Sequence, residues 1–108
     1  MDIDEIREFV RSGHYEFSLH AQQERLAEDL DVVDVEAAIL SGEIIEDYPN
    51  DPRGPSCLIN GNAVNQPVHV VIGWAGKEGD LKSMLRLITV YIPQPPKWKD
   101  ARTRGEHV

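Results

Sequence analysis

The sequence predicts an α+β domain, in which two or three N-terminal helices pack on a mostly antiparallel four-stranded sheet. Apolar residues in the first 42 positions recur every three or four residues, which is typical of helices. After Gly42, runs of β-branched and apolar residues alternate with Gly, Pro and Asn, which is typical of strands and turns. Helices followed by a run of strands favour this fold class. The 108 residues suit one domain over 1–108 (helical 1–42, sheet 43–92, basic tail 93–108).

Three helices are expected, each with its own boundary signals. In the first, Ile3, Ile6 and Val10 share one face and Gly13 ends the element. Ser18 is a good N-cap for the second and Asp31 for the third. The apolar stripe of the second helix has heptad-like spacing with one polar member and comprises Leu19, Gln23, Leu26 and Leu30. The buried stripe expected in the third, which Ser41-Gly42 closes, comprises Val32, Val35 and Ile39.

Four strands are expected after the helices, at 44–48, 56–60, 68–74 and 81–92. The last two are apolar enough for central places in the sheet. Strict alternation puts His69 on the face of Val71 and Gly73. In the last strand, alternation puts Thr89 and Tyr91 with Leu85 and Leu87, and leaves Arg86, Ile88 and Val90 on the other face.

Composition narrows the class of protein without naming a function. No apolar run approaches the ~18 residues of a membrane helix, and the acidic start does not resemble a signal peptide. The single cysteine, Cys57, excludes an intramolecular disulfide and a cysteine-based zinc site. We therefore expect a cytoplasmic globular domain with no membrane association.

The net charge of −8 hides an asymmetry between the two halves. Residues 1–52 contain 15 acidic and 3 basic side chains, a net −12, whereas 53–108 contain 4 acidic and 8 basic, a net +4. The average argues against a nucleic-acid partner, but the basic half could still present one positive face. An acidic helical surface that is merely solvated is the simpler interpretation.

Two histidines are the strongest candidates for chemistry. His20 lies at the start of the second helix, where the macrodipole favours a neutral ring, although its i+4 neighbour Glu24 favours the charged one. His69 lies inside an apolar strand. If they met, they would form a metal-independent acid–base pair, with Arg25 and Tyr91 as further catalytic candidates. For both histidines the alternative is a hydrogen-bonded structural residue. Neither a metal-binding motif nor a cofactor motif is present, so no metal and no cofactor are expected.

The tail holds the one basic and aromatic cluster of the chain. Lys97, Trp98 and Arg104 are its substrate-binding candidates, and Lys99 and Arg102 are interleaved with them. Such a cluster can hold RNA through phosphate contacts and stacking. It can equally be a docking segment or a solvated end.

A set of segments in this order resembles the domain of unknown function 4258 family. They are Ser18-Leu19-His20-Ala21, Arg25, Asp34 to Ile39, Gly42 to Pro49, Pro67 to Val71, Ile88 to Tyr91 with Pro93, and Trp98 with Arg104. Members commonly carry a second Arg with an Ile-Thr pair before the third helix, whereas 27–32 is acidic here. That departure weakens an RNA-binding role for the second helix.

The resemblance implies a fold similar to RelE/ParE-type toxins, some relatives of which cut RNA without a metal. Carried onto this chain, it makes His20 and His69 the acid–base pair, Arg25 and Arg104 phosphate binders, and Tyr91 a supporting donor. Fold alone does not fix function. Two hypotheses follow: a protein-binding module that uses its acidic helices, and a metal-independent ribonuclease. They leave a protein partner and RNA both open, and the sequence does not give the oligomeric state.

Overall fold

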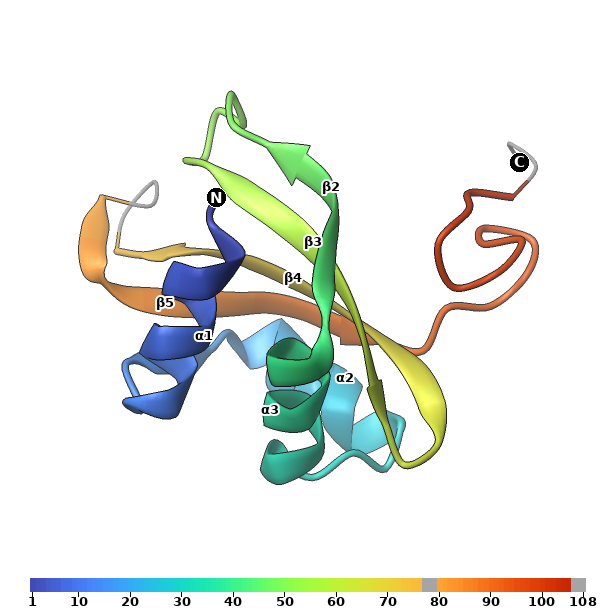
Figure 1. Cartoon of the computed structure of the whole chain (residues 1–108). Helices are drawn as coiled ribbons and strands as arrows, with labels where there is room; N and C mark the ends of the chain where they lie inside the picture. The colour runs from blue at the N-terminus through green and yellow to red at the C-terminus, as the bar shows by residue number, and fades with distance from the viewer. Residues whose placement is uncertain (77–79, 106–108) are drawn as a thin grey trace.

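A computed structural model describes residues 1–76 and 80–105 of the chain. It contains three helices and a five-stranded sheet in the order β1-β5-β4-β3-β2 (Figure 1). The helices are α1 (Ile3–Arg11), α2 (Leu19–Ala27) and α3 (Val32–Ser41). The strands are β1 (Tyr15–Phe17), β2 (Glu43–Tyr48), β3 (Ser56–Ala63), β4 (Gln66–Ala75) and β5 (Leu81–Tyr91). The α+β class is confirmed.

The second and third helices start at their predicted N-caps, Ser18 and Asp31, and the first is capped by Asp2. The Asp2 carboxylate accepts a hydrogen bond from the Asp4 amide, and the Ser18 hydroxyl accepts one from the Ala21 amide (3.0 Å each). Ser18 also donates to the Ile88 carbonyl at 2.9 Å, so the same side chain fixes the start of α2 on β5. The α2 helix is thereby held against the sheet at its first turn.

The prediction of four strands was wrong by one. Tyr15–Phe17 pairs with Leu85–Leu87 in parallel and extends the sheet beyond β5. Three residues are too few for an alternating pattern to show in the sequence. Hydrogen bonds from the Leu85 amide to the His14 carbonyl (3.1 Å) and from the Ser18 amide to the Leu87 carbonyl (2.9 Å) hold this edge strand. The other three pairings are antiparallel.

A bulge in β5 reverses the predicted face of part of that strand. Val71 pairs with Thr89, but Ile72 pairs with Leu87, so Ile88 is an extra residue. Leu87 therefore joins Val90 in the core, and Arg86 moves to the face that carries Thr89. Strict alternation, which placed Leu85 and Leu87 beside Thr89 and Tyr91, fails for this reason.

One face of the sheet is packed against the helices, and the hydrophobic core lies between them (Figure 1). The core residues that the helices contribute are Ile6, Val10, Ala21, Val35, Ala38 and Ile39. Across the opposite face, the tail after β5 returns toward β2. There it forms an isolated bridge between Trp98 and Arg104, and Trp98 is buried. The helical layer thus leaves the second face of the sheet to the tail and to solvent.

Candidate functional site

His69 lies on the face of the sheet away from the helices and is fully buried. Its Nε2 is 2.6 Å from the Ala101 carbonyl oxygen, which can only accept, so Nε2 carries the proton. Nδ1 is then the acceptor for the Tyr91 hydroxyl at 3.1 Å. Burial lowers the pKa of His69, and the nearby Arg104 lowers it further. His69 is therefore a neutral ring with both nitrogens occupied inside the chain.

The tail that covers His69 is docked through its aromatic and basic side chains. Trp98 packs edge-on against the His69 ring with centroids 4.4 Å apart. Arg104 lies 4.2 Å above the Trp98 ring and donates two hydrogen bonds to Glu46, at 2.9 and 2.7 Å. These bonds lower the pKa of Glu46 and raise that of Arg104. Arg102 forms an ion pair with Glu43 on the same edge strand.

Arg25 is also engaged within the chain. Its Nε donates to the Gln22 side chain at 2.5 Å, and one terminal nitrogen donates to the Leu30 carbonyl at 3.1 Å. The guanidinium lies 5.5 Å from the centroid of the Phe17 ring. These contacts close the turn between α2 and α3 and fasten it to the edge strand β1.

His20 opens onto a cavity of about 460 Å³ between α2 and the base of the tail. Its lining residues come from α2, from the end of β5 and from the tail: His20, Glu24, Thr89, Tyr91, Ile92, Gln94, Pro95, Lys97 and Trp98. The cavity brings together four of the predicted site residues, which are His20, Tyr91, Lys97 and Trp98. Arg25, His69 and Arg104 are not among its lining residues. His69 instead positions Tyr91 through the hydrogen bond to its hydroxyl.

Glu24 gives His20 a fixed partner that the sequence indicated only by spacing. His20 Nε2 lies 3.2 Å from Glu24 Oε1. The same oxygen accepts a hydrogen bond from the Val90 amide at 2.9 Å, so the carboxylate is anchored to β5. A carboxylate that orients one imidazole nitrogen leaves the other available to accept a proton. Glu24 and His20 therefore form a dyad at the rim of the cavity.

The outer surface of α2 differs from that of an ordinary amphipathic helix. Within α2 only Ala21 is buried, whereas Leu19 and Leu26 are 76% and 65% exposed. Glu24 and Arg25, which are charged, are half-buried instead. The predicted apolar stripe exists, but its two leucines face away from the core; only Leu30, beyond the helix, is buried.

Comparison with known proteins supports the family that the sequence motifs suggested. The family model described as Domain of unknown function (DUF4258) matches residues 17–92, from the end of β1 through β5. The chain belongs to this family. No curated protein and no solved structure matches it. The likeness to RelE/ParE-type toxins stays a prediction.

No helix in residues 1–76 and 80–105 has the length and apolar character needed to span a membrane. Over the same residues, no three His, Cys, Asp or Glu side chains gather into a group that could hold a metal ion. Cys57 is buried, and burial raises the pKa of its thiol to about 12, so it is inert as a nucleophile.

Proposed function

We propose that this domain is a protein-binding module that presents the outer face of α2 to a basic, amphipathic partner. The observation that carries the proposal is the outward orientation of Leu19 and Leu26. They lie seven residues apart, so a rotation of about 100° per residue puts them on one helix face. The spacing i, i+7 is one that helices use when they dock on a groove or on another helix.

The rest of the exposed face supports docking. Gln23 and Ala27 are also exposed and complete the outward stripe with the two leucines. Single exposed apolar residues are ordinary, but a helix that buries an alanine and exposes its leucines leaves its main apolar surface in water. Burying both leucines against a partner would contribute about 3 kcal/mol or more to binding.

Charge indicates the chemistry of the partner. Exposed Glu28, Asp29 and Asp31 follow the stripe at the C-terminal end of α2. The N-terminal half, to which the stripe belongs, carries a net charge of −12. A segment with Leu or Ile anchors flanked by Lys and Arg complements both features. A second copy of the chain is a poorer match, because each copy carries −8.

A designed peptide pair tests this proposal. One peptide is an amphipathic helix with leucines at i, i+3, i+4 and i+7 and lysines on its polar face; the other replaces every lysine with glutamate. We expect the lysine peptide to bind the whole chain, with NMR shift changes centred on α2. The double variant Leu19→Ser/Leu26→Ser should weaken it at least tenfold.

The matched control is Leu81→Ser, which removes an exposed leucine (47% exposed) from the start of β5. This variant should bind the lysine peptide as wild type does. Equal binding of the two peptides, or unchanged binding by the double variant, would overturn the proposal. Concentration-dependent dimerisation through α2 without peptide binding would overturn the choice of partner.

A second candidate function, metal-independent cleavage of RNA, is favoured by the Glu24–His20 dyad beside Lys97 and Tyr91. His20 would take the proton of a 2′-hydroxyl, whose oxygen then bonds to phosphorus as the bond to the 5′-oxygen breaks. Water in the open cavity would supply the proton to the departing oxygen, because the Tyr91 hydroxyl donates to His69, and His20 would return its proton to water. Lys97 would stabilise the charged phosphorane. The docked Arg102 and Arg104, and the acidic segment 28–31 that follows α2, favour the binding module over this activity.

Incubation with RNA in EDTA tests the second function. We expect the wild type to cleave RNA without metal. His20→Ala, which leaves the core intact, should reduce the cleavage rate by at least about a hundredfold. His14→Ala, in an exposed loop, is the matched control. Cleavage that is equal in wild type and His20→Ala would remove His20 from any such reaction.

A further inference from the structure

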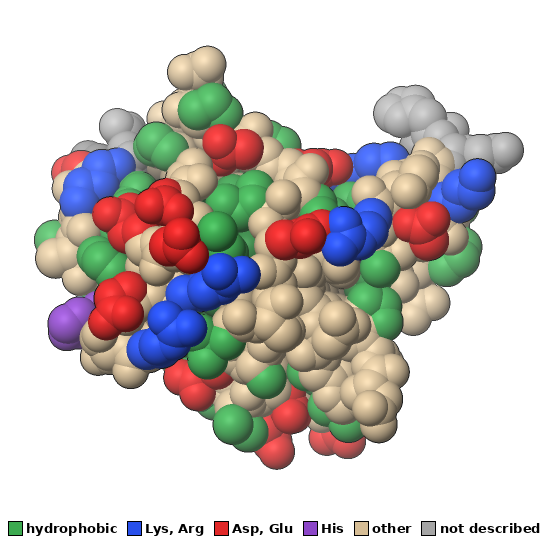
Figure 2. Space-filling model, in the orientation of Figure 1, with side chains coloured by type: hydrophobic (Ala, Val, Ile, Leu, Met, Phe, Trp, Pro, Cys, Tyr) green, Lys and Arg blue, Asp and Glu red, His purple; other side chains and the backbone are tan. Residues whose placement is uncertain are grey.

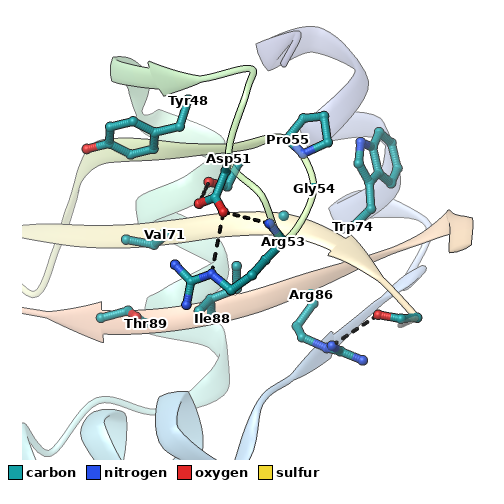
Figure 3. Close-up of a pocket in the computed structure, with 13 residues that line it drawn as sticks. Tyr48, Asp51, Arg53, Gly54, Pro55, Val71, Trp74, Arg86, Ile88 and Thr89 are labelled. Carbon is teal, nitrogen blue, oxygen red and sulfur yellow. Dashed lines mark hydrogen bonds and ion pairs between the residues drawn. The ribbon is translucent and has the colours of Figure 1, made fainter. Parts of the chain in front are cut away.

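The face of the sheet away from the helices has a second hollow, distant along β5 from the tail. It is a groove of about 440 Å³ between the β2–β3 loop and strands β4 and β5 (Figure 3). Its floor is formed by Val71, Gly73, Ile88 and Thr89. The volume lies within the range of small-molecule sites, about 300–1,000 Å³. None of the residues predicted from the sequence to form a site lines this groove.

The bulge in β5 is what builds the groove. Because Ile88 is the extra residue, Arg86 faces the same side as Thr89 and pairs across the sheet with Gly73. A regular strand would have turned Arg86 into the core. Gly73 keeps this part of the floor low, because a Cβ there would come within 3.0 Å of Ile88 Cδ1.

Two guanidinium groups and one carboxylate line the groove. Arg53 reaches in from the loop and contacts Asp51 through Nε at 3.4 Å, whereas Arg86 lies further along β5 (Figure 3). Within residues 1–76 and 80–105, Arg86 makes two polar contacts and both are long, 3.4 Å to the Gly76 carbonyl and 3.5 Å to Glu16. A guanidinium has five N–H donors, so Arg86 retains donors for a ligand. The described lining residues thus carry two positive charges and one negative charge, and Glu16 lies beside Arg86 from outside the groove.

We propose that this groove binds a small organic anion whose oxyanion pairs with Arg86 and whose flat apolar part lies on Val71 and Ile88. A guanidinium fork matches a carboxylate or a phosphate ester in two parallel hydrogen bonds. The Thr89 hydroxyl adds a donor to the floor. Two guanidinium groups, each beside a carboxylate, suit a small anion rather than a polyanion, and the chain as a whole carries −8.

NMR titration of the whole chain tests the site with three probes of similar shape: benzoate, phenyl phosphate and neutral benzyl alcohol. We expect at least one anion to bind saturably with a millimolar Kd, about that of a ligand this small. The shifts should centre on the Gly73 amide and the Arg86 Nε–H. Benzyl alcohol should bind at least tenfold more weakly, and the tighter anion tells a carboxylate site from a phosphate-ester site.

Arg86→Gln should raise the Kd for the anion at least tenfold. Arg86→Lys retains the charge but not the fork, so its Kd should lie between those of wild type and Arg86→Gln. Arg11→Gln, an exposed helix residue, is the matched control and should bind as wild type does. Three results would overturn the proposal: no saturable binding below about 10 mM, tighter binding of benzyl alcohol, or unchanged binding by Arg86→Gln. A short oligoribonucleotide that binds where neither small anion does would overturn the ligand class.

Discussion

The sequence suggested a binding role for the N-terminal helices and for the C-terminal tail, and the structure shows opposite behaviour for α2 and the tail. The tail contains the basic and aromatic cluster, yet its Trp98 is buried and both of its arginines pair with β2. The α2 helix has the weaker signal, but it turns its leucines to solvent. A residue cluster therefore indicates a partner only after the partners within the chain have been accounted for.

Surface charge follows the same pattern. Acidic side chains lie beside basic ones over much of the face in Figure 2, so many charges have an opposite charge nearby. Arg102 and Arg104 each pair with a glutamate of β2, which joins the basic half to the acidic half. Two of the positive charges in residues 53–108 are therefore paired within the chain, where they hold the tail against β2. The two leucines of the α2 stripe, in contrast, stay exposed to solvent.

Substitution of Trp98 removes the main contact of the docked tail and should have the largest effect on the free energy of unfolding. Trp98→Ala removes a buried ring that contacts His69 and Arg104, so we expect the free energy of unfolding to fall by about 3 kcal/mol in a urea titration. Trp98→Phe keeps most of the ring and should lose clearly less. A loss below about 1 kcal/mol for Trp98→Ala would mean that the tail does not stabilise the fold.

The protonation of His69 makes the stability of the docked tail depend on pH. Its pKa is lowered in the folded chain, so below its ordinary value of 6.5 the unfolded chain binds more protons. Stability should therefore be complete above pH 6.5 and fall as the pH drops below it, by at most about 1.4 kcal/mol per pH unit from this group. Losses from Glu46, whose pKa is also lowered, begin only below its ordinary 4.5.

Thermal unfolding between pH 7.5 and 5 measures this dependence. His69→Gln should flatten the curve in that window, whereas His14→Gln, at an exposed loop position, should keep the wild-type slope. A wild-type slope in His69→Gln would show that another group is responsible.

The ion pair between Arg104 and Glu46 should contribute a smaller amount. Both side chains are partly exposed (47% and 25%), so a double-mutant cycle with Arg104→Met and Glu46→Gln should give a coupling of about 0.5–1 kcal/mol. The coupling should shrink in high salt. The Arg102–Glu43 pair is more exposed (61% and 48%) and should couple less. Equal coupling for the two pairs would contradict this ranking.

The smallest effect on stability is expected from the stripe of α2. Leu19→Ser/Leu26→Ser should change the free energy of unfolding by about 0.5 kcal/mol or less, because neither leucine belongs to the core. Leu87→Ala, a core substitution, should lose about 2–5 kcal/mol under the same conditions. A loss above about 1.5 kcal/mol in the double variant would mean that the stripe supports the fold.

Local signals in the sequence predicted much of the fold, because caps and periodicity act over a few residues. The starts of α2 and α3 at Ser18 and Asp31 and the four longer strands are examples. The short β1 and the bulge at Ile88 depend on pairing between distant segments, which no local pattern records. That is also why the groove at Arg86 was missed.

The candidate site could be predicted only as a set of residue types. His20, Tyr91, Lys97 and Trp98 do line one cavity, although they come from three parts of the chain. Which residues the chain uses for itself could not be foreseen. His69 bonds to Ala101, 32 residues away, and Arg104 bonds to Glu46, 58 residues away. The anchoring of Glu24 on Val90 is equally long-range.

Site-specific photo-crosslinking in cells compares the two regions most directly. A photoreactive residue replaces Gln23 on the outer face of α2 in one variant and Lys99 on the tail in the other; both positions are exposed. We predict a specific crosslink from position 23 to a partner segment rich in Lys and Arg with apolar anchors, lost in Leu19→Ser/Leu26→Ser, and none from position 99. Crosslinks from position 99 alone, or crosslinks from position 23 that survive loss of both leucines, would contradict the claim that α2 is the binding surface.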